Sequence, residues 1–194
     1  MVLKDWQTGG IHEMEIEYYR VVQDERFTEV AYPLNLTKAQ LLNHITIAQE
    51  QDISSLQFYV DGQAAFLDWL DDPYYMLSDE LKCIWEQYQP SLVWRQVVLA
   101  DQHTRTQRLC WLMASTEVIN ALSPLSEWNK DGTLKKMVLD ERKLRGHKVC
   151  RVQGAGAPEV IVDLDVAECM LRFPLKGIQL QRLQIERDVL AGKD

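Results

Sequence analysis

Two stretches of the chain share one pattern: MLSDELKCIWEQY at residues 76–88 and, 85 positions later, IVDLDVAECMLRF at residues 161–173. Each begins with apolar residues that lead to a residue able to cap a helix, Ser78 in the first and Asp163 in the second, and acidic residues follow. The apolar residues beyond the cap recur at i, i+3, i+4 and i+7, which is the spacing of one buried helix face. The pattern therefore predicts, twice, a strand followed by a capped helix.

Each helix is predicted to bury four residues: Leu81, Ile84, Trp85 and Tyr88 in the first, and Val166, Cys169, Met170 and Phe173 in the second. A further strand follows each helix, so the repeated units extend over residues 73–99 and 158–185. After Leu180 the alternation of apolar residues slips by one position, which predicts a β-bulge near Gln181 and Arg182. The repetition fits an internal duplication and equally fits two independent copies of a common arrangement.

The rest of the chain predicts more strands than helices. Alternating or wholly apolar runs predict strands at residues 13–22, 56–60, 108–113, 136–139 and 148–152, the last two joined around Gly146. A capping box predicts a helix at 37–49, a second short helix begins at Ser115 or Thr116, and 129–132 is a turn. The run at 108–113 is apolar on both faces, which places it in the middle of a sheet or beneath covering helices. We therefore predict one α+β domain over residues 1–194 with a mostly antiparallel sheet, in which residues 1–70 form a candidate N-terminal subregion.

Composition excludes several classes of protein. Apolar residues make up 46% and charged residues 26% of the 194 positions, values of a globular domain with a sizeable core. The 29 acidic and 21 basic residues give a formal charge of −8, which disfavours binding to nucleic acid and to anionic membranes. We find no membrane-spanning run and no signal peptide, so the expected location is the cytoplasm. The four cysteines, in predicted strands or helices, are expected to be reduced and buried.

A search for catalytic and ligand-binding patterns gives no site. The glycines at 154 and 156 lack a third glycine and lead into a strand, so they do not form a phosphate-binding loop. His147 and Cys150 fall on opposite faces of a strand, which is the wrong geometry for a pair of metal ligands. We therefore expect no catalytic residues, no metal and no cofactor.

The candidate binding surface is an acidic stretch that contains a tryptophan. Its residues are Asp68, Trp69, Asp71 and Asp72, with Asp79 and Glu80 close by at a helix start. Exposed aromatic side chains beside charges are typical of protein interfaces. The alternative interpretation is a solvated loop over a core tryptophan. Of the other tryptophans, Trp85 and Trp111 are predicted to be core residues, whereas Trp94 and Trp128 are further candidates for exposed anchors.

Five short segments, taken in order, resemble one known family. They are residues 77–81, 138–141, 147–152, 161–163 and 175–178. Their order and spacing resemble the immunity protein eleven family, formerly a domain of unknown function, found beside polymorphic toxin genes in bacteria. The resemblance concerns the region 71–194 and departs from the usual pattern at Cys150 and Leu164.

The resemblance implies a cytoplasmic immunity protein, which is not an enzyme and which binds and neutralises a cognate secreted toxin. It provides no catalytic residues to transfer. The acidic charge suits a basic toxin as the partner. Two alternatives stay open, namely a non-catalytic adaptor or structural subunit of a larger assembly, and an enzyme whose site is dispersed along the chain. The oligomeric state is also open.

Overall fold

A computed structural model describes residues 16–34, 39, 55–60, 64–71, 75–115, 118–154 and 158–187. It confirms the predicted α+β fold with mostly antiparallel sheets. The predicted helix at 37–49, apart from Ala39, and residues 13–15 of the first predicted strand lie outside the described residues. No described helix has both the length and the apolar character needed to cross a membrane.

The described elements follow one another along the chain in this order: β1 (Tyr18–Gln23), β2 (Ser55–Val60), β3 (Trp69–Leu70), β4 (Met76–Ser78), α2 (Asp79–Tyr88), β5 (Val93–Asp101), β6 (Gln107–Ser115), β7 (Val118–Ile119), β8 (Glu127–Trp128), β9 (Leu134–Lys136), β10 (Val138–Asp140), α3 (Glu141–Leu144), β11 (Val149–Val152), β12 (Glu159–Asp163), α4 (Leu164–Leu171), β13 (Ile178–Arg182) and β14 (Gln184–Glu186).

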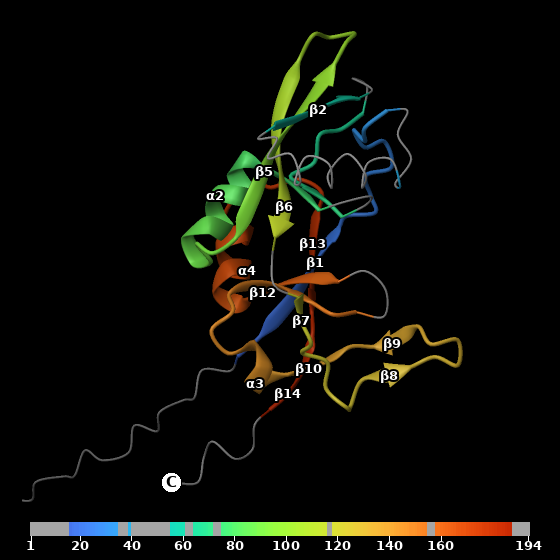
Figure 1. Ribbon diagram of the computed structural model, residues 1–194, viewed down its shortest axis with the longest axis vertical. Coiled ribbons are helices and arrows are strands. Elements are labelled where there is room, and N and C mark those ends of the chain that lie inside the picture. Colours follow the sequence, from blue (N-terminus) through green and yellow to red (C-terminus); the bar gives the residue numbers. More distant parts are fainter. Residues whose placement is uncertain are drawn as a thin grey trace, which may run out of the picture.

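Two five-stranded sheets form the frame of the molecule. The first has the strand order β2-β5-β6-β4-β3 and the second has the order β13-β1-β12-β11-β7. The helices α2 and α4 lie one beyond the other on the same side of the molecule and contact each other (Figure 1). The strand predicted at 108–113 is β6, and its central place in the first sheet is confirmed. Strands β1 and β2, from the candidate N-terminal subregion, share these sheets with strands from beyond residue 71, since β1 pairs with β12 and β2 pairs with β5.

Both repeated units have the predicted order of strand, cap, helix and strand. The Ser78 hydroxyl accepts a hydrogen bond from the backbone N–H of Leu81 (3.3 Å), and the Asp163 carboxylate accepts one from the N–H of Val166 (3.1 Å). These bonds satisfy N–H groups that the first helical turn leaves free. The caps explain why each helix begins directly after its strand.

The two units also share a topology that the sequence does not predict. In the first half β6 lies between β4 and β5, and in the second half β1 lies between β12 and β13, each antiparallel to both neighbours. Strands β3 and β11 then pair antiparallel with β4 and β12. The order β3-β4-β6-β5 therefore corresponds to β11-β12-β1-β13, strand by strand and with the same directions. These are two split βαβ units, and the second takes its inserted strand β1 from the N-terminal part of the chain; the unit of β3, β4, β5 and β6 is called the first half and the unit of β1, β11, β12 and β13 the second half.

The two helices meet through residues at equivalent positions. The indole N–H of Trp85 on α2 lies 3.3 Å from the sulfur of Met170 on α4, and these residues are 85 positions apart, the offset of the repeat. Both side chains belong to one apolar core that contains residues of both units. Contact between equivalent residues indicates that an approximate twofold axis passes between α2 and α4.

Two predictions about the second unit are wrong. Phe173 is 49% exposed because α4 ends at Leu171, so the buried face of this helix is shorter than predicted. The slip after Leu180 does not mark a bulge. The N–H of Leu183 bonds to the carbonyl of Tyr18, and the chain then leaves β1 and pairs parallel with β10 as β14. The change of alternation is thus a change of sheet.

Two predictions about residues 115–152 are also wrong. The residues after 117 form the short strand β7 beside β11 instead of a helix. The predicted strands at 136–139 and 148–152 do not pair around Gly146, because α3 lies between them and Asp140 caps it. The predicted turn at 129–132 is confirmed and joins β8 to β9.

The four cysteines are free, but their burial differs from the prediction. Cys110 and Cys150 are buried, and burial raises the pKa of their thiols to about 11 and about 12. Cys169 is partly buried and Cys83, on α2, is exposed. The prediction of four buried thiols holds for the two strand cysteines and is wrong for Cys83.

Candidate functional site

The predicted aromatic anchor, Trp69, lies in the core. Its side chain is fully buried, stacks on Tyr75 with ring centroids 5.2 Å apart, and packs against Trp85 at 5.5 Å. Of the two interpretations of Trp69, the structure therefore confirms the one in which it is a core residue. Trp69 stabilises the packing of β3 on α2 and is not available to a partner.

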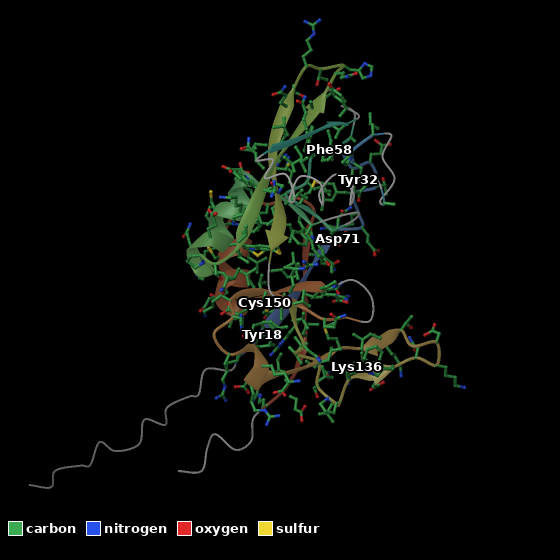
Figure 2. All side chains as sticks on the ribbon, viewed as in Figure 1. Tyr18, Tyr32, Phe58, Asp71, Lys136 and Cys150 are labelled. Carbon is green, nitrogen blue, oxygen red and sulfur yellow. The ribbon has the colours of Figure 1, made fainter. Side chains whose placement is uncertain are left out.

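Three of the predicted carboxylates lie near Trp69 in the sequence, and the two that are described hold the fold together. Asp68 is buried, pairs with Arg108 (2.8 Å) and accepts the backbone N–H of Lys176 (2.6 Å). Asp71 accepts the backbone N–H of Gln23 at 2.8 Å and lies on the side of the molecule away from α2 (Figure 2). Asp72 lies outside the described residues.

Asp79 and Glu80 are exposed in the first turn of α2. Asp71 directly follows Leu70, which pairs with Met76 at one end of the β3–β4 pair. Strand β4 runs from Met76 away from that end and leads into α2, so Asp79 and Glu80 lie at the opposite end. The predicted acidic cluster is therefore divided between two places. Of the predicted carboxylates that are described, Asp79 and Glu80 form the accessible acidic pair.

Trp111, which the sequence predicted to be a core residue, lies beside this acidic pair. Its indole N–H donates to the Asp79 carboxylate (2.8 Å), and the Lys82 ammonium lies 4.4 Å from its ring centroid. Lys82 in turn pairs with Glu86 (2.7 Å). The ring is partly exposed and is held in one orientation by contacts on its edge and face.

Trp111 belongs to a row of side chains on one face of the first sheet. Between β5 and β6, Gln96 pairs with Trp111 and Val98 pairs with Leu109. Ala100 lies on the same face of β5 as Val98, and its partner on β2 is Tyr59. Paired residues of neighbouring strands lie on the same face. Leu109 is 37% and Tyr59 50% exposed, whereas Val98 and Trp111 are partly buried. We call Tyr59, Val98, Leu109 and Trp111 the open sheet face, and Asp79 and Glu80 lie at its margin.

The opposite face of the same strands is a packed core that includes Phe58, Val97, Leu99, Cys110 and Leu112. A strand with apolar residues on both faces suggested burial on both faces. The structure instead buries one face and leaves part of the other uncovered, because α2 reaches only the end of β6 near Met113. The sequence does not predict this surface, because the part of the first sheet that α2 covers is set by tertiary packing and not by the residues near Trp111 in the chain.

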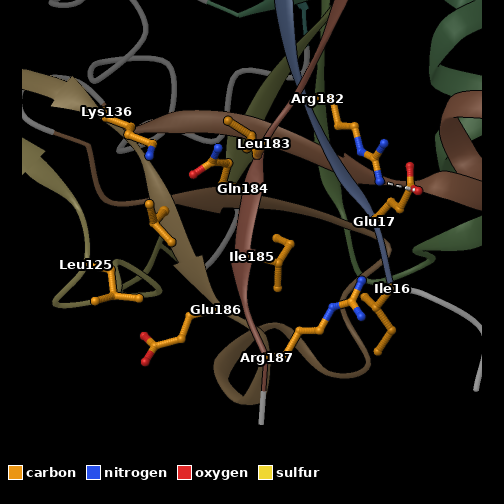
Figure 3. A pocket seen from close by; sticks show the side chains of 11 residues that line it. Ile16, Glu17, Leu125, Lys136, Arg182, Leu183, Gln184, Ile185, Glu186 and Arg187 are labelled. Atoms are coloured by element: carbon orange, nitrogen blue, oxygen red, sulfur yellow. Dashed lines mark hydrogen bonds and ion pairs between the residues drawn. The ribbon is translucent and has the colours of Figure 1, made fainter. Parts of the chain in front are cut away.

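Two hollows also lie on the surface of the described residues. The larger, of about 600 Å³, lies over β14 between Lys136 and Ile16, and Glu17 pairs across it with Arg182 at 2.5 Å (Figure 3). The smaller, of about 460 Å³, contains Arg20, which pairs with Glu159 at 2.9 Å. The charged groups in these pairs neutralise each other.

The chemistry around the hollows is sparse. No histidine, cysteine or serine is among the described residues that line them. Within the described ranges no group of three or more His, Cys, Asp or Glu side chains is placed to hold a metal ion. The open sheet face is thus the most distinctive exposed feature of the part of the chain that the structure describes.

Comparison with known proteins adds no assignment. Neither a scan against protein-family models nor a search of the curated proteins finds a match to this chain.

Proposed function

We propose that this chain is a bacterial immunity protein that binds a cognate secreted toxin in the cytoplasm and blocks it. The open sheet face is the observation that supports this proposal most. It displays Trp111, Tyr59 and Leu109 on a sheet, beside the acidic pair Asp79 and Glu80. Aromatic side chains surrounded by polar groups are typical of the centres of protein interfaces.

The rigidity of this surface also favours a tight-binding protein. The strand that carries Trp111 and Leu109 is paired on both sides, and its other face is packed against a core. A surface that is ordered before binding loses little conformational entropy when the complex forms. Immunity proteins need this property, since toxin–immunity pairs reach dissociation constants of about 10⁻¹³ M or below.

The charge of the chain and of the margin of the open sheet face favours a basic partner. The chain carries 29 acidic and 21 basic side chains, and Asp79 and Glu80 are exposed beside the open sheet face. A field of one sign accelerates association with a partner of the opposite sign. The resemblance of the region 71–194 to the immunity protein eleven family supports the same function.

The mechanism needs no chemistry from this chain. A partner that covers the active site or the entry surface of a toxin blocks it by occupying the space that the substrate requires. The chain has to fold stably, find the toxin quickly and release it slowly, and charge and buried aromatic area contribute to the last two steps.

Co-expression tests the proposal. The product of the adjacent upstream gene is expressed in bacteria alone, with this chain, and with an unrelated immunity protein as the control. We expect growth arrest with the upstream product alone, rescue only by this chain, and a one-to-one complex on purification. Toxicity without rescue or complex contradicts the proposal. A stable complex with a product that is not toxic favours the adaptor alternative instead.

A further inference from the structure

The two halves of the chain provide an internal comparison for the open sheet face. In the first half Leu77 pairs with Trp111, and in the second half the equivalent residue of β12, Val162, pairs with Tyr19. Tyr19 is therefore the counterpart of Trp111. Two residues earlier on each strand, the counterpart of Leu109 is Glu17.

The counterpart positions in the second half are polar and satisfied within the chain. The Tyr19 hydroxyl donates to the Glu17 carboxylate at 2.6 Å, and the guanidinium of Arg182 pairs with the same carboxylate at 2.5 Å. Arg182 pairs with Tyr19 in the sheet as Gln96 pairs with Trp111. The same topology thus accepts a closed polar network at these positions.

The fold therefore does not require apolar residues at the positions of Leu109 and Trp111. Exposed apolar side chains are a risk of aggregation in a chain that has nothing to cover them. Val98 continues the apolar surface onto β5, and on β2 Gln57 lies beside Val98, with Tyr59 two residues further along on the same face. An apolar surface on one half, where the other half has ion-paired residues, indicates a requirement for binding.

The groups at the margin define the chemistry of the partner. Asp79 uses one oxygen for the Trp111 indole, and neither Asp79 nor Glu80 forms an ion pair among the described residues. Lys82, which follows them on α2, is already neutralised by Glu86. A partner with a lysine or arginine at its margin and an apolar side chain at its centre complements both features.

We propose that the open sheet face is where the toxin binds, and that the toxin presents a basic surface with an apolar side chain seated between Trp111 and Leu109. This inference rests on the proposed function, and it adds the surface and the charge of the partner. A second exposed aromatic side chain is Trp128 on the β8–β9 hairpin, where Lys135 and Lys136 pair with Glu127 at 3.0 and 3.9 Å.

The variants are chosen from the internal comparison. Leu109→Glu installs the residue of the counterpart position, at a site that is already 37% exposed. Glu80→Lys reverses one marginal charge, and its matched control is Asp165→Lys, at the equivalent position in the first turn of α4. Both reversals change the net charge equally and oppose a helix dipole, but Asp165→Lys also breaks the ion pair with Lys148 (2.5 Å), so thermal unfolding of the two variants is compared before their association rates. Trp128→Ala is the control for the second aromatic site.

Affinity and association rate for the purified toxin are measured by surface plasmon resonance at 50 and 300 mM salt, with thermal unfolding to verify that each variant is folded. We expect Leu109→Glu to weaken binding by at least about 30-fold, the size of an interface hot spot. We expect Glu80→Lys to slow association about tenfold at low salt and less at high salt. Asp165→Lys and Trp128→Ala are expected to bind as the wild type does.

Each outcome separates the inference from the proposed function. If Leu109→Glu and Glu80→Lys both bind the toxin with wild-type affinity, the inferred surface is wrong. The proposed function still stands in that case, provided that the wild-type chain neutralises the toxin. Loss of binding in Trp128→Ala alone overturns it in favour of the hairpin. A folded wild type that neither binds nor neutralises the toxin contradicts the proposed function itself. If Asp165→Lys slows association as much as Glu80→Lys does, the effect is long-range and the assignment of the margin is wrong.

Discussion

Replacing Gly177 with alanine should strain the junction where the two halves of the chain meet. Gly177 has φ +75°, and a Cβ at this position would lie 2.6 Å from Cδ1, 2.8 Å from Cβ and 2.9 Å from Cδ2 of Leu67. The Gly177 carbonyl accepts the N–H of Asp24, and the preceding carbonyl, of Lys176, accepts the N–H of Asp68. The backbone at this point is therefore held on both sides and cannot easily move away from Leu67.

Two costs add in this variant. A side chain in the left-handed region costs about 1–2 kcal/mol, and overpacking of a filled core costs about 1–3 kcal/mol. We expect Gly177→Ala to lower the free energy of unfolding by about 2–5 kcal/mol. Gly146 provides a matched control, because it has φ +84° and no atom lies within 4 Å of the place that its Cβ would take. Gly146→Ala should therefore cost only about 1–2 kcal/mol.

The assay is urea unfolding followed by tryptophan fluorescence, with equal slopes required for the comparison. A double-mutant cycle with Leu67→Ala separates the two costs. Leu67→Ala removes both Cδ atoms but keeps the Cβ contact, so it should relieve about 1 kcal/mol of the Gly177→Ala cost. The reasoning is refuted if Gly177→Ala and Gly146→Ala cost the same, or if the cycle shows no coupling.

Three further outcomes follow from burial and hydrogen bonding. Trp69→Phe should cost about 1–3 kcal/mol of unfolding free energy, whereas Trp128→Phe should change it by less than about 0.5 kcal/mol, and urea unfolding compares them. Cys83 should react with a thiol reagent in the native protein, while the buried cysteines of β6 and β11 react only on unfolding, which mass spectrometry of the labelled peptides reports. Hydrogen bonds from the Thr104 hydroxyl and from nearby backbone N–H groups lower the pKa of Asp101. The folded-state pKa of Asp101 thus lies below the unfolded value of about 3.9. The stability that this carboxylate contributes is therefore complete above about pH 3.9 and is lost as the pH falls through the folded-state pKa. Asp101→Asn should destabilise the protein more at pH 7 than at pH 3.

The parts of the fold that the sequence predicted are those set by local interactions. Each helix start depends on a capping oxygen and an N–H three residues later, and both belong to one short stretch, as at Ser78 and Asp163. The insertion of β1 between β12 and β13 has no such signal. About 140 residues separate β1 from β12 and about 160 separate it from β13, and any strand with one apolar face could occupy this place. The strands and the helix of the second half could therefore be predicted from the sequence, but the order of its strands in the sheet could not.

The candidate surface shows the same limit in another form. The sequence offered Trp69 both as a candidate anchor and as a core residue, and it predicted that Trp111 is a core residue. The structure buries Trp69 under α2 and leaves Trp111 partly exposed at the edge of that helix. What decides exposure is how far α2 extends across the sheet, and neither tryptophan's neighbours in the sequence contain that information.

The pairing of α2 with α4 explains how one half can be specialised without loss of stability. Trp85 and Met170 join the helices across the approximate twofold axis, so the second half helps to hold α2 in place. Asp79, in the first turn of α2, in turn fixes the Trp111 indole. Because the ring is positioned before any partner arrives, binding spends little free energy on ordering it. Under the proposed function, the closed polar half therefore supports the half that carries the open sheet face.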